Sequence, residues 1–167
     1  MHFLKTVQRL PIDLKTAWNF FSSPKNLKVI TPPYMGFEVT SEYREDKMYP
    51  GMIITYNVTP LFNIALNWAT EITHVKEPSY FVDEQRFGPY KFWHHQHKFY
   101  EIQGGVEMHD ILHYKVGFWF LGNIANSVLV KNKLKDIFDF RYRKLEEIFG
   151  KMNDYLVHDK NKMKQKR

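Results

Sequence analysis

Histidine and aspartate side chains gather in two stretches of the second half of the chain, residues 93–99 and 106–116. Both stretches alternate apolar and polar residues, which is typical of half-exposed strands. Gln103-Gly104-Gly105 separates them and predicts a tight turn. A hairpin folded at this turn sets His97 opposite Asp110. One face of the hairpin is then expected to carry Trp93, His95, His97, Phe99, Met108, Asp110, Leu112 and Tyr114.

Two histidines on one strand face can serve three kinds of chemistry. As metal ligands, His95 and His97 would need a third ligand, which Asp110 or Asp83 could supply, and an open position for catalysis. As a general base, His97 oriented by Asp110 could take an acidic proton from a bound carbonyl compound. As a structural network, the same pair would satisfy its own buried polar groups without a metal. The sequence favours the structural network over a metal site, because no other part of the chain adds ligands at metal-site density.

Composition excludes several classes of protein. The 167 residues are enough for one domain with one core, and aromatic residues make up 17% of them. The absence of cysteine excludes disulfides, thiolate nucleophiles and cysteine-based metal sites. No apolar run approaches the roughly 18 residues of a membrane span, and the first residues have no signal-peptide pattern. We therefore expect a cytoplasmic protein without stable membrane insertion.

The net charge of +6 belongs mostly to the end of the chain. Residues 151–167 carry six basic and two acidic side chains, a net charge of +4, which leaves +2 for residues 1–150. Such a segment is typical of a solvated, disordered tail. No base-stacking motif or amphipathic arm accompanies it, so neither nucleic acid nor a membrane is the expected partner.

The elements that must position the hairpin can be read from the alternation of apolar residues. Residues 2–10 predict a strand, and residues 13–21, capped by Asp13, predict a short helix that a second one over 25–30 follows. Further strands are predicted over 37–45, 51–59, 64–75 and 79–86, before the two strands of the hairpin.

The period changes after Gly117. Residues 118–122 predict an apolar loop, and Asn126 or Ser127 could cap a long helix that ends at Gly150. An apolar stripe with one arginine follows this helix at spacings of three and four residues: Val130, Leu134, Ile137, Phe138, Arg141, Leu145 and Ile148. Arg141 could hold a ligand carboxylate or phosphate, but pairing with Asp83 or Asp110 is the favoured interpretation.

The order of elements predicts an α+β fold. The connections between the later strands are too short for crossover helices, so about seven strands should form one antiparallel sheet. Such a sheet curls because its strands twist, and only the long C-terminal helix can cover the concave face. A curled sheet around a single helix leaves space between them, which is the natural place for a ligand.

Several local motifs resemble one known superfamily. They are Trp18-Asn19-Phe20-Phe21-Ser22-Ser23-Pro24 with Leu27, Ile30-Thr31-Pro32-Pro33, Trp68 with Ile72, Phe81 with Asp83, Gly88-Pro89-Tyr90, and Trp93-x-His95-x-His97-x-Phe99 with Asp110. Over residues 1–150 the chain resembles the START-like superfamily, also called SRPBCC, and in particular its small bacterial cyclase/dehydrase-like or ligand-binding branch. The resemblance implies the helix-grip fold and a hydrophobic cavity. It does not imply a reaction, because this superfamily contains carriers, receptors and enzymes.

We therefore expect one helix-grip domain over residues 1–150 that binds a small, mostly hydrophobic or amphipathic ligand beneath the C-terminal helix. The alternative is a cyclase or dehydratase with His97 as general base and Asp110 as its orienting group. No cofactor and no metal are expected, and the sequence does not indicate an oligomeric state. The residues expected to bind the ligand are Trp68, Phe81, Asp83, Gln85, Trp93, His95, His97, Met108, Asp110, Leu112, Tyr114, Leu134, Phe138 and Arg141.

Overall fold

The computed structural model describes residues 1–42, 46–59, 64–117 and 125–152, with the backbone alone for 125–127. The strands are β1 (His2–Leu10), β2 (Glu38–Val39), β3 (Met52–Val58), β4 (Leu66–Lys76), β5 (Tyr80–Phe87), β6 (Tyr90–Ile102) and β7 (Gly105–Val116). The α-helices are α1 (Leu14–Phe21) and α2 (Ala125–Phe149), and two 3-10 turns are η1 (Pro24–Asn26) and η2 (Pro33–Met35). None of the described helices is both long enough and apolar enough to cross a membrane.

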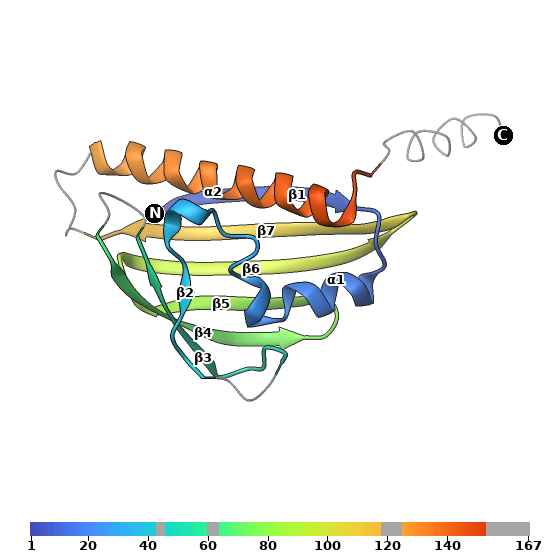
Figure 1. Cartoon of the computed structure of the whole chain (residues 1–167), viewed down its shortest axis with the longest axis horizontal. Helices are drawn as coiled ribbons and strands as arrows, with labels where there is room; N and C mark the ends of the chain where they lie inside the picture. Colours follow the sequence, from blue (N-terminus) through green and yellow to red (C-terminus); the bar gives the residue numbers. More distant parts are fainter. Residues whose placement is uncertain (43–45, 60–63, 118–124, 153–167) are drawn as a thin grey trace.

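All seven strands form one antiparallel sheet in the order β1-β7-β6-β5-β4-β3-β2. The predicted hairpin is confirmed in its register: His97 lies opposite Asp110, and Ile102 lies opposite Gly105. The turn residue Gly104 has a φ of +81°, which a residue without a side chain adopts at little cost. The α+β helix-grip fold predicted from the sequence is thus confirmed (Figure 1).

Helix α2 lies along one side of the sheet, where it contacts β1 and β7 (Figure 1). The predicted stripe is buried at Val130, Leu134, Phe138 and Leu145. Ile148 departs from the prediction because it is 39% exposed. In the last turn Phe149 packs instead, with its ring edge against Phe20 at 5.0 Å between centroids.

The two ends of α2 differ in how well the sequence predicts them. The helix already includes Ala125, so the predicted caps Asn126 and Ser127 lie inside its first turn, and that prediction is wrong. At the other end Gly150 has a φ of +89° and its amide donates to the carbonyl of Glu146, which ends the helix as predicted. The predicted apolar loop over 118–122 lies outside the described residues.

The segment between β1 and β3 forms an insert that packs against the middle of the sheet. Helix α1 begins as predicted, because an oxygen of Asp13 accepts a hydrogen bond from the amide of Thr16 at 2.9 Å. Trp18 on this helix is 1% exposed and packs edge-on against Phe81 and Phe99. The insert therefore anchors to β5 and β6, the two strands that carry Asp83 and the two inward-facing histidines.

Two predictions for the rest of the insert need correction. The second short helix, predicted over 25–30, is a 3-10 turn at Pro24–Asn26. The amides of Asn26, Leu27 and Val29 donate to carbonyls three residues earlier, and the prolines at 32 and 33 disfavour an α-helix in the residues before them. The strand predicted over 37–45 covers only Glu38–Val39 in the structure, which does not describe residues 43–45. It ends there because the amides of Thr40 and Ser41 both donate to the carbonyl of Thr55, which interrupts the ladder.

Candidate functional site

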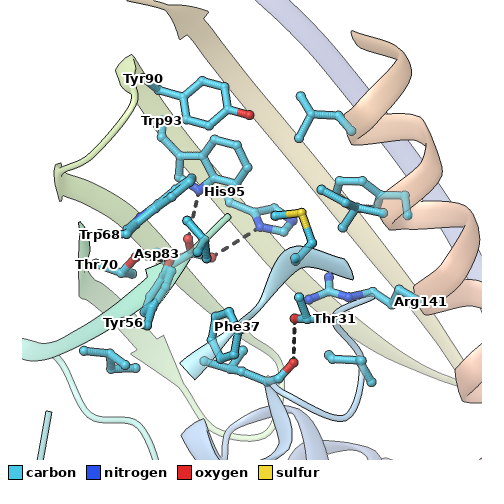
Figure 2. Close-up of a pocket in the computed structure, with 18 of the residues that line it drawn as sticks. Thr31, Phe37, Tyr56, Trp68, Thr70, Asp83, Tyr90, Trp93, His95 and Arg141 are labelled. Carbon is cyan, nitrogen blue, oxygen red and sulfur yellow. Dashed lines mark hydrogen bonds and ion pairs between the residues drawn. The ribbon is translucent and has the colours of Figure 1, made fainter. Parts of the chain in front are cut away.

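A pocket of about 220 Å³ lies between β3 to β6, helix α2 and the insert. Most of its wall is apolar, and a run of aromatic rings forms one side (Figure 2). Figure 2 shows Thr31 of the insert and Arg141 of α2 on one side of this space and Tyr56, Trp68 and Trp93 on the other. The pocket is therefore built from segments that lie far apart in the sequence.

Four aromatic side chains from three strands pack against one another in the wall. Trp68 stacks on Tyr56 with ring centroids 5.7 Å apart and meets Trp93 at an interplanar angle of 88° and 5.2 Å. Tyr90 lies 4.8 Å from Trp93. Trp68 is 9% exposed, and its Nε1 has no hydrogen-bond partner among the described residues. The wall thus contains one buried N–H donor that the described part of the protein leaves unused.

Asp83 of β5 belongs to a polar cluster at this wall and lies on one side of His95 and His97. One carboxylate oxygen, Oδ1, accepts a hydrogen bond from Trp93 Nε1 at 3.0 Å. The other, Oδ2, lies 2.9 Å from His97 Nε2 and 3.3 Å from His95 Nδ1. The register explains this meeting, because Asp83 lies opposite His95 on the neighbouring strand. Both histidines and Asp83 line the pocket.

Asp110 of β7 lies on the other side of the same two imidazoles. Its Oδ1 lies 3.0 Å from His95 Nε2 and accepts a hydrogen bond from Arg141 of α2 at 3.1 Å. His97 Nδ1 is 2.9 Å from the same oxygen but lacks hydrogen-bonding geometry, so His97 is hydrogen-bonded through Asp83. Each imidazole is therefore placed between two carboxylates.

The electrostatics of the cluster follow from this alternation. Burial penalises the charged imidazole, but Asp83 and Asp110 outweigh that penalty and raise the pKa of His95 to about 9. Burial also penalises the two carboxylates, yet their pKa values lie below the ordinary range. The histidines cause this for Asp83, and Arg141 together with the histidines causes it for Asp110. Both aspartates are thus charged at neutral pH.

Nine of the residues expected from the sequence to bind a ligand line this pocket: Trp68, Phe81, Asp83, Trp93, His95, His97, Leu134, Phe138 and Arg141. Asp110 is 1% exposed and lies behind the histidines. Gln85 hydrogen-bonds the backbone of Tyr90 and so closes the turn between β5 and β6. Met108 packs in the core that α1 covers, and Leu112 and Tyr114 pack with α2 in a second apolar cluster.

Sequence reasoning did not assign several lining residues to the site: Thr31, Met35, Phe37, Tyr56, Thr70, Tyr90 and Lys133. The alternation of residues 51–59 already places Tyr56 on the inner face, and the same argument on the next strand holds for Thr70. Phe37 begins the alternation of the strand predicted over 37–45, but that pattern does not place it at the pocket, and no periodic signal exists for Met35. Both residues reach the pocket because the amide of Thr59 donates to the carbonyl of Met35, which holds the insert against the end of β3.

Comparison with known proteins places the chain by its fold. No protein-family model matches the sequence, and no curated protein matches it either. Solved structures match closely in shape. A START superfamily protein from Mycobacterium smegmatis aligns with a TM-score of 0.65 at 11% identity, over 89% of this chain and 99% of that one.

Two other solved structures give a similar result. Protein Ms6760 from Mycobacterium smegmatis aligns with a TM-score of 0.61 at 18% identity, over 87% of this chain and 89% of that one. The protein TTHA0849 from Thermus thermophilus aligns with a TM-score of 0.62 at 16% identity, over 87% of this chain and 95% of that one. The chain therefore has a START-like fold. At such identities the likeness establishes the fold and not an activity.

Proposed function

We propose that this protein binds a small, mostly apolar molecule in the pocket beneath α2, with the polar end of the molecule directed at Asp83, His95 and His97. The observation that carries this proposal is the pocket itself, which has an aromatic wall and one charged cluster. A concave apolar site with a few convergent polar groups is what small-molecule sites have in common. The unused N–H of Trp68 adds a donor for an acceptor atom of the ligand.

The volume limits the size of the ligand. Pockets for drug-sized molecules measure roughly 300–1,000 Å³. The pocket of about 220 Å³ lies below that range. It suits one compact ring system or a short chain, and a lipid with two long acyl chains would need the sheet and α2 to separate.

Binding can be tested by filling the pocket from α2. Ile137 lines the pocket, whereas its neighbour Asp136 is exposed. The Ile137→Trp variant should bind an apolar fluorescent probe at least about tenfold more weakly, because the larger side chain occupies the space and one lost methylene-sized contact already costs about 0.8 kcal/mol. The matched Asp136→Trp variant should stay within about twofold of the parent. Native mass spectrometry of the purified proteins should show a bound small molecule in the parent and in the Asp136→Trp variant, but not in the Ile137→Trp variant.

Equal probe affinity in the two tryptophan variants would contradict the proposal. Circular dichroism and a thermal melt of both variants check that each one is folded. A probe that binds the parent and the Ile137→Trp variant equally well would be bound outside the pocket.

Proton transfer in the same pocket is the second candidate function, of the cyclase or dehydratase kind. The observation that favours it is that His97 lines the pocket with its Nε2 hydrogen-bonded to Asp83. The His97→Gln variant keeps much of the shape of the side chain and removes the base. Retained probe affinity together with lost turnover of a carbonyl substrate would support an enzyme. Retained affinity with no turnover lost on any candidate substrate leaves binding as the function.

A further inference from the structure

We propose that Asp83, His95 and His97 form a binding site for one divalent transition-metal ion, such as Zn²⁺, at the polar end of the pocket. The three residues can each offer one ligand atom, and these atoms lie within 4.8 Å of one another. Two imidazoles and one carboxylate are a common set of protein ligands for catalytic zinc. The sequence alone named Asp83 as a possible third ligand but did not favour a metal, because no other part of the chain adds ligands at metal-site density. The structure adds that Asp83 of β5 lies against both histidines.

Two of the three spacings between the candidate ligand atoms are close to those around zinc. Zinc binds nitrogen and oxygen at about 2.0–2.1 Å with tetrahedral angles, so two of its ligand atoms lie about 3.4 Å apart. Asp83 Oδ2 lies 3.3 Å from His95 Nδ1 and 2.9 Å from His97 Nε2. Each of these two distances needs to grow by no more than about half an ångström, and the ligand atoms of the two histidines already lie within 4.8 Å of each other. Side-chain torsions can make such adjustments.

The side chains around these three residues already hold them as metal ligands are held. Metal-binding histidines normally donate their second nitrogen to a carboxylate, which fixes the ring and its tautomer. Here His95 Nε2 hydrogen-bonds Asp110 at 3.0 Å, while His97 Nδ1 lies 2.9 Å from the same oxygen without hydrogen-bonding geometry. Arg141 holds Asp110, and Trp93 donates to the Asp83 oxygen that the metal does not need. The outer groups of a metal site are thus in place for His95 and Asp83, and a small rotation of the His97 ring would add the third.

The position of the cluster agrees with this assignment. Arg141 pairs with Asp110 at 3.1 Å, and Asp83 lies on the opposite side of the two imidazoles. Because the three ligand residues line the pocket, a coordination position stays open toward a bound molecule.

The site can be tested with metal ions alone. Untagged protein is freed of metal with EDTA, the chelator is removed, and Zn²⁺ and Co²⁺ are titrated at pH 8, where protons compete less for imidazole. We expect one equivalent of Zn²⁺ by calorimetry and the visible absorption bands of four- or five-coordinate Co²⁺. His97→Gln and Asp83→Asn should each weaken binding at least about 100-fold. Asp110→Asn should weaken it about 10- to 100-fold, because it removes the carboxylate behind the rings.

Matched controls come from the outer face of the same hairpin. His94 and His113 lie opposite each other there, with ring centroids 6.4 Å apart. His94→Gln and His113→Gln should bind Zn²⁺ within about twofold of the parent. Absence of Zn²⁺ and Co²⁺ uptake at millimolar concentration overturns the proposal, as does parental affinity in both His97→Gln and Asp83→Asn, or loss of binding in His94→Gln.

Two further measurements keep the test independent of folding and of the proposed ligand. Near-ultraviolet circular dichroism checks each variant for its tertiary structure. In the parent, hyperfine-shifted imidazole signals from two histidines in the Co²⁺ complex support the assignment even if a variant does not fold, and their absence contradicts it. Apolar probe binding measured in EDTA tests the pocket without the metal, so failure of one proposal does not decide the other.

Discussion

The imidazole of His95 has a carboxylate on each side and is only 5% exposed. A buried ion network of this kind is costly to disturb, because removal of one partner leaves a charge without compensation. The protonated form of His95 is favoured in the folded chain, because the pKa of its imidazole is raised there. On unfolding the imidazole returns to its ordinary pKa, and this stabilisation is lost. The stability of the protein should therefore depend on pH through this residue.

The first prediction concerns alkaline pH. The pKa of His95 is raised to about 9 in the folded state, from an ordinary value of 6.5. The stabilisation is then fully present below about pH 6.5 and is lost as the pH rises through 9. In EDTA, the free energy of unfolding measured with urea should fall by on the order of 3 kcal/mol between about pH 6.5 and 10. A flat profile over this range would contradict the prediction.

The matched control for this prediction is the neighbouring histidine on the outer face. His94 also contacts a carboxylate, Glu84, at 2.7 Å, but both side chains are 27% exposed. His95→Gln should be less stable than the parent at about pH 6.5 and should lose most of the alkaline slope. His94→Gln should keep the slope, since solvent screens an exposed pair.

At the scale of the elements, the β6–β7 hairpin packs closely against the end of β1 at Gly105. A Cβ atom on Gly105 would lie 2.1 Å from the carbonyl oxygen of Leu10 and 3.2 Å from Cα of Pro11. Both contacts are with backbone, which cannot rotate away as a side chain would. The glycine thus permits the close approach of the hairpin to the strand that precedes α1.

The second prediction follows from this contact. Gly105→Ala should lower the free energy of unfolding by at least about 2 kcal/mol, as overpacking against rigid atoms does. Gly51→Ala is the control, because a Cβ there meets nothing within 4 Å and only the φ of +89° is unfavourable. The control should cost about 1 kcal/mol. Equal losses in urea unfolding would show that the contact with Leu10 relaxes.

The elements were more predictable from the sequence than the contacts between them. Strict alternation and a glycine turn predict the pairing of His97 with Asp110. A shift of the register by one residue would move every side chain to the other face, so the alternation of apolar residues also fixes the register. That pairing does not predict which atoms meet. His97 hydrogen-bonds Asp83 on β5 and not Asp110 on β7. The two carboxylates lie at similar distances, so the side-chain torsions decide which of them is hydrogen-bonded. Met35 and Phe37 were not predictable because the route of an irregular insert depends on tertiary hydrogen bonds.

At the scale of the whole molecule, the first strand and the last helix of the fold are hydrogen-bonded to each other. Gln8 of β1 donates to the carbonyl of Tyr142 on α2 at 2.8 Å, across 134 residues of sequence. Leu145 on the same helix is fully buried in the main core. The last turns of α2 therefore belong to the folding unit, and we expect this unit to end near residue 150.

The third prediction tests that boundary. Removal of residues 153–167 should change the melting temperature by less than about 2 °C and leave probe affinity unchanged, because the domain expected from the sequence ends before them. Removal of residues 145–167 deletes Leu145 and Phe149 from the core and should cost at least about 3 kcal/mol. A large loss of stability in the shorter truncation would move the boundary toward the end of the chain.

The alternation along β6 has a consequence for how this protein can be redesigned. Trp93, His95 and His97 face the pocket, while the alternate residues His94, Gln96 and Lys98 occupy the opposite face. A library confined to the three odd-numbered positions would change what the pocket recognises and leave the outer surface as it is. A single inserted residue upstream in the strand would instead exchange the two sets of side chains. The specificity of the pocket can therefore be changed by substitutions in β6, whereas an insertion in this strand would destroy the pocket wall.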